Sequence, residues 1–191
     1  MDKGRLEAFS DGVIAILITI MVLELHIPEA TDLAALRPLV PVFLSYVLSF
    51  VYLGIYWNNH HHLLQATRQI TGGVLWANLH LLFWLSLFPF ATAWMGENHF
   101  DPVPAALYGV VSLLAAIAYY VLQTTIVRAQ IDSSHLTAAL GRDVKGKISP
   151  AIYALAIVSV VISQWIAVGL YVLVALMWLV PDRRIERRLA G

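Results

Sequence analysis

Long stretches without Asp, Glu, Lys or Arg divide this chain into apolar segments. Residues 38–67, 69–96 and 102–127 carry no such side chain over 30, 28 and 26 positions. A helix that crosses about 30 Å of hydrocarbon needs about 20 largely apolar residues. Each stretch therefore predicts one transmembrane helix, and residues 5–26 predict another at the start of the chain.

The last apolar stretch is longer, because residues 148–181 include 34 positions without a charge. As a single helix they would extend about 50 Å, which is too long for one crossing. A break near Ser163-Gln164 or at Gly169 would give two short helices. We therefore predict an all-α integral membrane protein of one domain, residues 1–191, with six transmembrane helices, the last two forming a short hairpin.

Composition agrees with a membrane protein: 60% of the residues are hydrophobic, 13% are charged, and the mean hydropathy is +0.75. Twelve basic and twelve acidic side chains cancel, so net charge gives no reason to expect a nucleic-acid partner. The chain has no cysteine, which excludes disulfides, thiolate metal sites and thiol nucleophiles.

Basic residues predict the orientation, because Lys and Arg in short loops stay on the cytoplasmic side. With six helices, Arg37 falls alone on one side of the membrane. The other side receives both termini and eleven basic residues: Lys3, Arg5, Arg68, Arg128, Arg142, Lys145, Lys147 and the four arginines of "RRIERR". We expect a multi-pass protein of the plasma membrane with both termini in the cytoplasm.

The first helix carries charge close to its apolar centre. Only residues 12–23 separate Asp11 from Glu24, which is about 18 Å of helix, less than the hydrocarbon thickness. A charge that faces lipid without a partner is costly, so Arg5, Glu7 and Asp11 are expected to face protein or water. Apolar residues surround the helix, which favours its burial among other helices.

One stripe of the first helix contains Ile16, Thr19 or Ile20, and Leu23, at spacings of three and four residues. Around a symmetry axis such a stripe would form stacked apolar rings with one hydroxyl layer, a hydrophobic constriction. The same periodicity is also typical of ordinary helix packing in membranes. Periodicity alone favours the packing interpretation.

The opening motif Arg5-x-x-x-Phe9-Ser10-Asp11, followed by "GVIAILITIMVLEL", resembles the signature of a known family. It is similar to the lysosomal potassium channel family, transmembrane protein 175, in its single-repeat prokaryotic form. "YWNNHH" at the end of the second helix and "NLHLLFWLSLFPF" in the third extend the resemblance. The last three helices match only in character.

The resemblance implies a homotetramer in which four first helices line a pore. It implies conduction of potassium in preference to sodium without a TVGYG filter, a motif that this sequence lacks. It places Ile16 at the narrowest apolar ring, Ile20 and Leu23 at further rings, and Thr19 at the hydroxyl layer.

Topology places the start of the first helix, the end of the second and the start of the third at the same depth. Arg5, Phe9, Ser10 and Asp11 should therefore meet the second and third helices. We predict a structural clamp in which Asp11 is held by donors such as Trp57, Asn78 or one of the histidines His60, His61 and His62. Consecutive histidines point around a helix, so we predict no metal site.

The leading functional hypothesis is a potassium channel whose partners are three further copies, potassium ions and membrane lipid, with no cofactor beyond the permeant ion. A second hypothesis is a proton-coupled carrier in which Asp11 and histidines relay protons, because intramembrane ionisable residues also mark such pathways. An enzyme has little support, since HExxH, GxSxG and GxGxxG are all absent.

Overall fold

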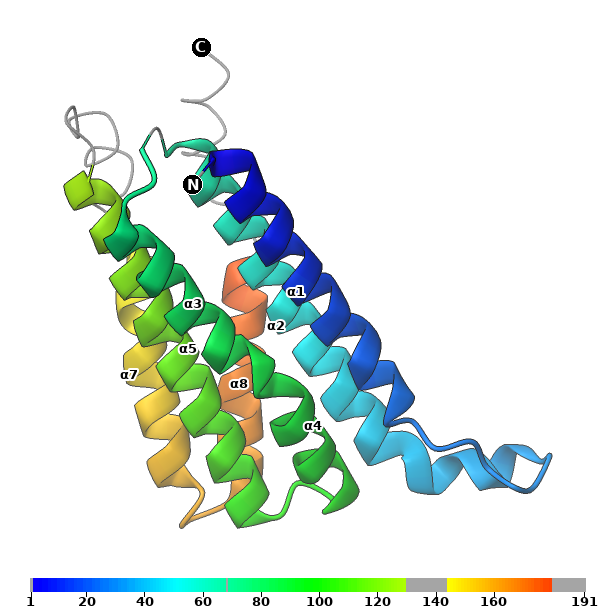
Figure 1. Cartoon of the computed structure of the whole chain (residues 1–191). Helices are drawn as coiled ribbons and strands as arrows, with labels where there is room; N and C mark the ends of the chain where they lie inside the picture. Colours follow the sequence, from blue (N-terminus) through cyan, green and yellow to red (C-terminus); the bar gives the residue numbers. More distant parts are fainter. Residues whose placement is uncertain (1, 68, 130–143, 180–191) are drawn as a thin grey trace.

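The computed structural model describes residues 2–67, 69–129 and 144–179. In these ranges the helices are α1 (Lys3–Leu23), η1 (Leu33–Leu39), α2 (Val40–Gln65), α3 (Gly72–Ser86), α4 (Phe88–Glu97), α5 (Pro102–Ala129), α7 (Val144–Ser159) and α8 (Gln164–Leu179). Because η1 continues into α2 and α3 into α4, the helices form six segments that alternate in direction (Figure 1). The predicted six-helix architecture is confirmed.

Segment lengths agree with the charge-free stretches. Four segments are long and apolar enough to cross a membrane: Lys3–Leu23, Leu33–Gln65, Gly72–Glu97 and Pro102–Ala129. The helices α7 and α8 have 16 residues each, about 24 Å of helix, which is less than the hydrocarbon thickness. A turn at residues 160–163 joins them, so the short hairpin breaks at Ser163-Gln164, and Gly169 lies inside α8.

The third segment is interrupted between α3 and α4. Leu87 is both the C-cap of α3 and the N-cap of α4, and Pro89 lies in the first turn of α4. Proline lacks a backbone N–H and suits the first turn of a helix, where no intrahelical bond is lost. Thr71 caps the other end of α3 by accepting a hydrogen bond from the Val74 amide at 3.4 Å.

A left-handed turn connects α4 to α5. His99 and Phe100 have φ values of 52° and 63°, a conformation that is uncommon for residues other than glycine. Phe100 is nevertheless buried, and its ring packs against Trp165 at the start of α8 with centroids 5.7 Å apart. This packing holds the strained turn and ties it to the final hairpin.

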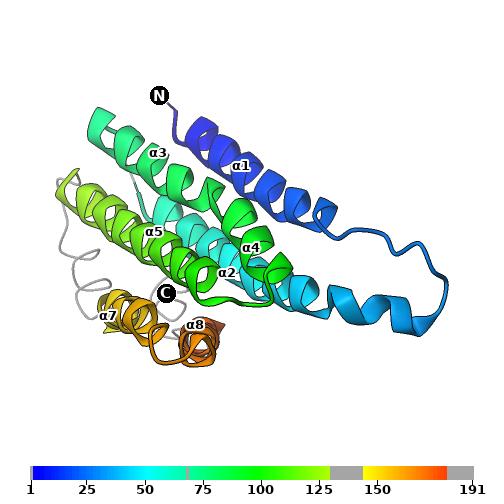
Figure 2. The same cartoon turned by 90° about the horizontal axis from the view of Figure 1, so that it is seen from below.

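The first helix lies at one edge of the bundle. Figure 2 shows α1 beside α3 on one side and α7 with α8 on the opposite side. Helix α5 lies between them and contacts α3, α4, α7 and α8, whereas α1 contacts α2, α3 and α4. The connection that carries η1 projects from the bundle (Figures 1 and 2). The chain therefore covers only one side of α1.

Most basic residues gather at one end of the bundle, where Asp2, Glu7 and Asp11 also lie. One end holds the start of α1, the end of α5 and the start of α7, with the basic residues Lys3, Arg5, Arg128, Lys145 and Lys147. The opposite end holds Arg37 and the acidic residues Glu29, Asp32, Glu97 and Asp101. Arg68, Arg142 and the basic tail lie outside the described residues.

Two glycines allow helices to approach closely. A Cβ on Gly96 of α4 would collide with the Ser45 hydroxyl and lie 2.8 Å from the Val42 Cα of α2. A Cβ on Gly109 of α5 would collide with the hydroxyl of Tyr171, which donates a hydrogen bond of 3.0 Å to the Ala105 carbonyl. Small residues of this kind allow membrane helices to pack backbone against backbone.

We expect Gly109→Ala to destabilise the bundle by about 1–3 kcal/mol, because the added methyl group overpacks the α5–α8 contact. The measurement is the thermal unfolding midpoint of the purified protein in detergent. Gly169→Ala is the matched control, because nothing lies within 4 Å of a Cβ at that position. Equal midpoints for the two variants would contradict the close approach.

Candidate functional site

Helix α1 has two distinct faces. One face is buried against the rest of the chain and contains Leu6, Ser10, Ile14, Leu17 and Met21, at spacings of three and four residues. The opposite face is exposed and contains Arg5, Phe9, Gly12, Ile16, Thr19, Ile20 and Leu23. The second set includes all four residues that the resemblance assigns to a pore lining.

Apart from Arg5 at its start, the exposed face is apolar except for the hydroxyl layer at Thr19. The exposed fractions of Ile16, Ile20 and Leu23 are 56%, 39% and 78%. Thr19 is also exposed, and its hydroxyl donates a hydrogen bond of 2.9 Å to the Ile16 carbonyl. Because the proton is used in this bond, the lone pairs of the Thr19 oxygen remain available to accept from water or to coordinate a cation.

A buried hydrogen-bond chain anchors the other face. The Asn78 side-chain amide on α3 donates to the Ser10 hydroxyl on α1 at 2.9 Å. Its carbonyl oxygen lies 2.7 Å from His60 Nε2 on α2, and since an amide oxygen only accepts, His60 is the donor. All three side chains are buried, His60 with 1% exposure. This Ser10–Asn78–His60 anchor joins three helices.

The predicted clamp is therefore built around Ser10 and not around its neighbour. Asp11 is half-buried, and within the described ranges its carboxylate makes no hydrogen bond or ion pair to Trp57, Asn78 or the histidines. Trp57 is exposed and its ring stacks on that of His61, with centroids 6.1 Å apart. Ser10 and Asp11 are consecutive, so their side chains point in different directions around α1. Ser10 faces inward, whereas Asp11 lies at the edge of the buried face.

The sequence leaves His60, His61 and His62 open as donors, and the structure brings His60 to Asn78. A signal for the correct histidine exists in α2, where the buried polar or aromatic residues Ser45, Ser49, Tyr52, Tyr56 and His60 recur every three or four positions. His60 continues this stripe, whereas His61 does not.

No group of three His, Asp or Glu side chains that would hold a metal ion occurs among the residues described.

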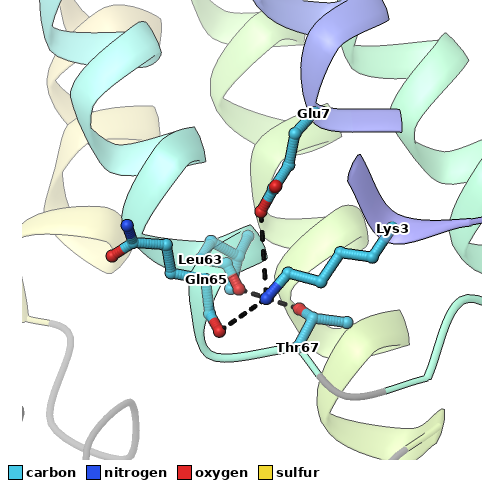
Figure 3. A network of polar contacts seen from close by, with 5 residues as sticks. All are labelled: Lys3, Glu7, Leu63, Gln65 and Thr67. Atoms are coloured by element: carbon cyan, nitrogen blue, oxygen red, sulfur yellow. Dashed lines mark hydrogen bonds and ion pairs between the residues drawn. The ribbon is translucent and has the colours of Figure 1, made fainter. Parts of the chain in front are cut away.

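A second contact ties α1 to α2 at the basic end of the bundle (Figure 3). Lys3 donates to the carbonyl oxygen of Gln65 at 2.8 Å and forms an ion pair with Glu7 at 3.8 Å. Thr67 donates to the Leu63 carbonyl at 2.8 Å. The Lys3 ammonium group of α1 thus lies at the C-terminal end of α2. There it pairs with a backbone carbonyl that has no intrahelical partner and offsets the negative end of the α2 dipole. This contact was not predicted from the sequence.

Comparison with known proteins places these features in a family. Residues 5–89 match the family model described as "Endosomal/lysosomal potassium channel TMEM175". A potassium channel of Chryseobacterium sp. (strain P1-3) is 54% identical over 189 residues, covering 99% of this chain and 98% of that protein. The chain belongs to the TMEM175 family.

Structural comparison agrees with the TMEM175 assignment. The crystal structure of a lysosomal potassium-selective channel TMEM175 homolog from Chamaesiphon minutus matches with a TM-score of 0.80 and 28% identity, covering 92% of this chain and 95% of that one. An endosomal/lysosomal proton channel TMEM175 of Bos taurus is 39% identical over 83 residues, which is 37% of this chain and 17% of that protein. The resemblance expected from the motifs is confirmed.

The region matched by the TMEM175 model contains both faces of α1 and all three anchor residues. It ends at Pro89, where α4 begins, so α5, α7 and α8 lie outside it. The signature motif thus includes the exposed Arg5 and Phe9, the anchored Ser10 and the half-buried Asp11.

We expect Asn78→Ala to lower stability by about 1–3 kcal/mol, because it leaves the buried Ser10 hydroxyl and His60 Nε2 without a partner. The measurement is the unfolding midpoint in detergent together with the elution profile of the particle. Asn58→Ala is the matched control, since Asn58 is exposed on the same turn of α2 as the anchor. A normal midpoint and particle for Asn78→Ala would show that the anchor does not hold α1.

Proposed function

We propose that four copies of this chain form a potassium-selective channel whose pore is lined by the exposed face of α1. The observation that carries the proposal is the division of α1 into an anchored face and an exposed face. The exposed face is a continuous apolar stripe that includes Thr19, and it lies at the edge of the bundle, where other copies can reach it. Membership of the TMEM175 family supports the same arrangement.

In this proposal Ile16 forms the narrowest ring, with Ile20 and Leu23 as further apolar rings. An apolar ring excludes much of the water around an ion, and hydrophobic constrictions are an established type of gate. Potassium holds its hydration shell less tightly than sodium, so partial dehydration penalises sodium more. The free lone pairs of Thr19 would replace part of the lost hydration, one turn from Ile16.

The charge distribution supports a plasma-membrane channel with its basic end in the cytoplasm. The acidic end, with Glu29, Asp32, Glu97 and Asp101, would then face outward and attract cations to the pore entrance.

Proton movement is the second candidate function. Mammalian relatives are named as proton channels, and Asp11 is a half-buried carboxylate on the anchored half of the pore helix without a hydrogen-bond partner among the residues described. A carrier that uses Asp11 and histidines would require a proton gradient, whereas a channel would pass potassium without one.

Flux measurements separate the two functions. We expect the purified chain in liposomes to pass potassium down its gradient when the pH is equal on both sides, and the solubilised particle to have four times the 21.2 kDa mass of the chain, apart from bound detergent. Potassium flux that strictly requires a pH gradient would favour the carrier. A monomeric particle that conducts normally would exclude the fourfold pore.

Substitution of Ile16 tests the position of the constriction. We expect Ile16→Asn to raise conductance or reduce the preference for potassium over sodium, because an amide ring retains water where isoleucine excludes it. Single-channel recording with potassium and sodium on opposite sides measures both quantities. Ile27→Asn serves as the control, because Ile27 is 92% exposed but lies beyond the end of α1. Permeation unchanged by Ile16→Asn would remove Ile16 from the pore.

A further inference from the structure

A cleft lies inside the bundle, away from the exposed face of α1. It has a volume of about 40 Å³ and is lined by residues of α2, α5, α7 and α8. Half of its twelve lining residues are aromatic: Tyr52, Tyr56, Tyr119, Tyr120, Tyr153 and Trp178. Tyr120 is 49% exposed and the other five are not, so the cleft opens on the side of Tyr120.

Two polar groups in the cleft have no hydrogen-bond partner in the described parts of the chain. Gln123 of α5 lines the cleft with only 6% of its surface exposed, and no side chain or backbone group bonds its amide. The Tyr56 hydroxyl of α2 is likewise unpaired. Neither the Gln123 amide nor the Tyr56 hydroxyl is among the fully enclosed side-chain atoms without a partner, so both groups remain accessible to a small molecule.

Two other polar groups around the cleft are paired. The Trp178 indole N–H donates to the Ser149 hydroxyl at 2.9 Å, and the Tyr119 hydroxyl donates to the Asn59 carbonyl at 3.2 Å. The Gln123 amide is thus an unpaired polar group in a cleft where neighbouring groups are hydrogen-bonded. It offers a donor and an acceptor side by side.

The charge of the lining selects the kind of occupant. None of the twelve lining residues is Asp, Glu, Lys, Arg or His, so a charged molecule would lose its hydration without compensation. Lys145 and Lys147 flank the lining residue Gly146 in sequence and disfavour cations further. At the open side of the cleft, the exposed Tyr120 ring favours a flat ring that stacks against it.

We propose that this cleft binds a small neutral molecule with a planar ring and an amide-like hydrogen-bonding edge, which pairs with Gln123 and Tyr56. The enclosed volume is smaller than the roughly 150 Å³ that holds a benzene ring, so the ring occupies the open side at Tyr120 and the polar edge enters first.

The cleft is also connected to the helix that anchors α1. Tyr56 lines the cleft, and His60, one turn further along the same face of α2, donates to Asn78 in the anchor. An occupant that shifts this turn of α2 changes the support of α1. The binding site thus acts on ion flux through α2, and this second step rests on the proposed channel function.

Binding is tested with three water-soluble probes that share one ring and differ in charge: benzamide, benzoate and benzyltrimethylammonium. Each is titrated into the full chain in nanodiscs and followed by saturation-transfer NMR, with empty nanodiscs as the blank. We expect benzamide to bind at least tenfold more tightly than either charged probe. Equal or tighter binding of a charged probe, or no binding of benzamide, would overturn the proposal.

Variants locate the site. Gln123→Leu should weaken benzamide binding at least tenfold and leave the unfolding midpoint unchanged or higher, because the amide has no partner to lose. Thr124→Val is the control, since Thr124 neighbours Gln123 on α5 but does not line the cleft. If Gln123→Leu fails to fold, Tyr56→Phe removes only the second polar group and should weaken binding about threefold. Unchanged binding in the folded variants contradicts the assignment.

Flux separates the two steps of the proposal. Benzamide should change potassium flux in the wild-type chain and have no effect on Gln123→Leu. If benzamide binds through Gln123 and flux does not respond, the coupling through α2 is wrong and the site remains. If neither chain conducts potassium, the channel proposal fails while the binding result is unaffected.

Discussion

The Ser10–Asn78–His60 hydrogen-bond chain decides how α1 is rotated within the bundle. Each of these groups is buried in a protein surrounded by hydrocarbon, where an unpaired polar group finds no water to replace its partner. Turning α1 away from α3 would break the bond to Ser10 and expose Leu6, Ile14 and Leu17. Three helices are therefore fixed together by one amide, and the other face of α1 is left open as a consequence.

The rest of the bundle provides a rigid support for this anchor. Thr92 of α4 donates to the Ser49 hydroxyl of α2 at 2.6 Å, and Ser49 donates to the Tyr108 hydroxyl of α5 at 3.0 Å. Together with the close approaches at Gly96 and Gly109, these bonds replace the hydrophobic driving force that membrane helices lack among lipid tails. These two hydrogen bonds are buried inside the bundle.

Helix α2 links two parts of the molecule that have different properties. Its buried stripe runs from Ser49 through Tyr52 and Tyr56 to His60, and so passes from the interior cleft to the anchor of α1. Near the end of α2, Lys3 adds a further contact between the two helices (Figure 3). The cleft and the anchor of α1 therefore share one buried face of α2.

The sequence by itself determined the membrane character, the six helices, the final hairpin and the family. Charge-free length sets the number of crossings, and the 34-residue stretch was too long for one crossing, so a break followed from length alone; the structure decided for Ser163-Gln164 over Gly169. The tertiary structure decided which polar neighbour carries the anchor. Ser10 and Asp11 differ by one position, and His60 and His61 likewise, so each pair is separated by about 100° of rotation that local pattern leaves open. The tertiary structure also decided the cleft around Gln123. Its walls come from four helices that are far apart in the chain, so only their packing brings an unpaired amide next to aromatic rings.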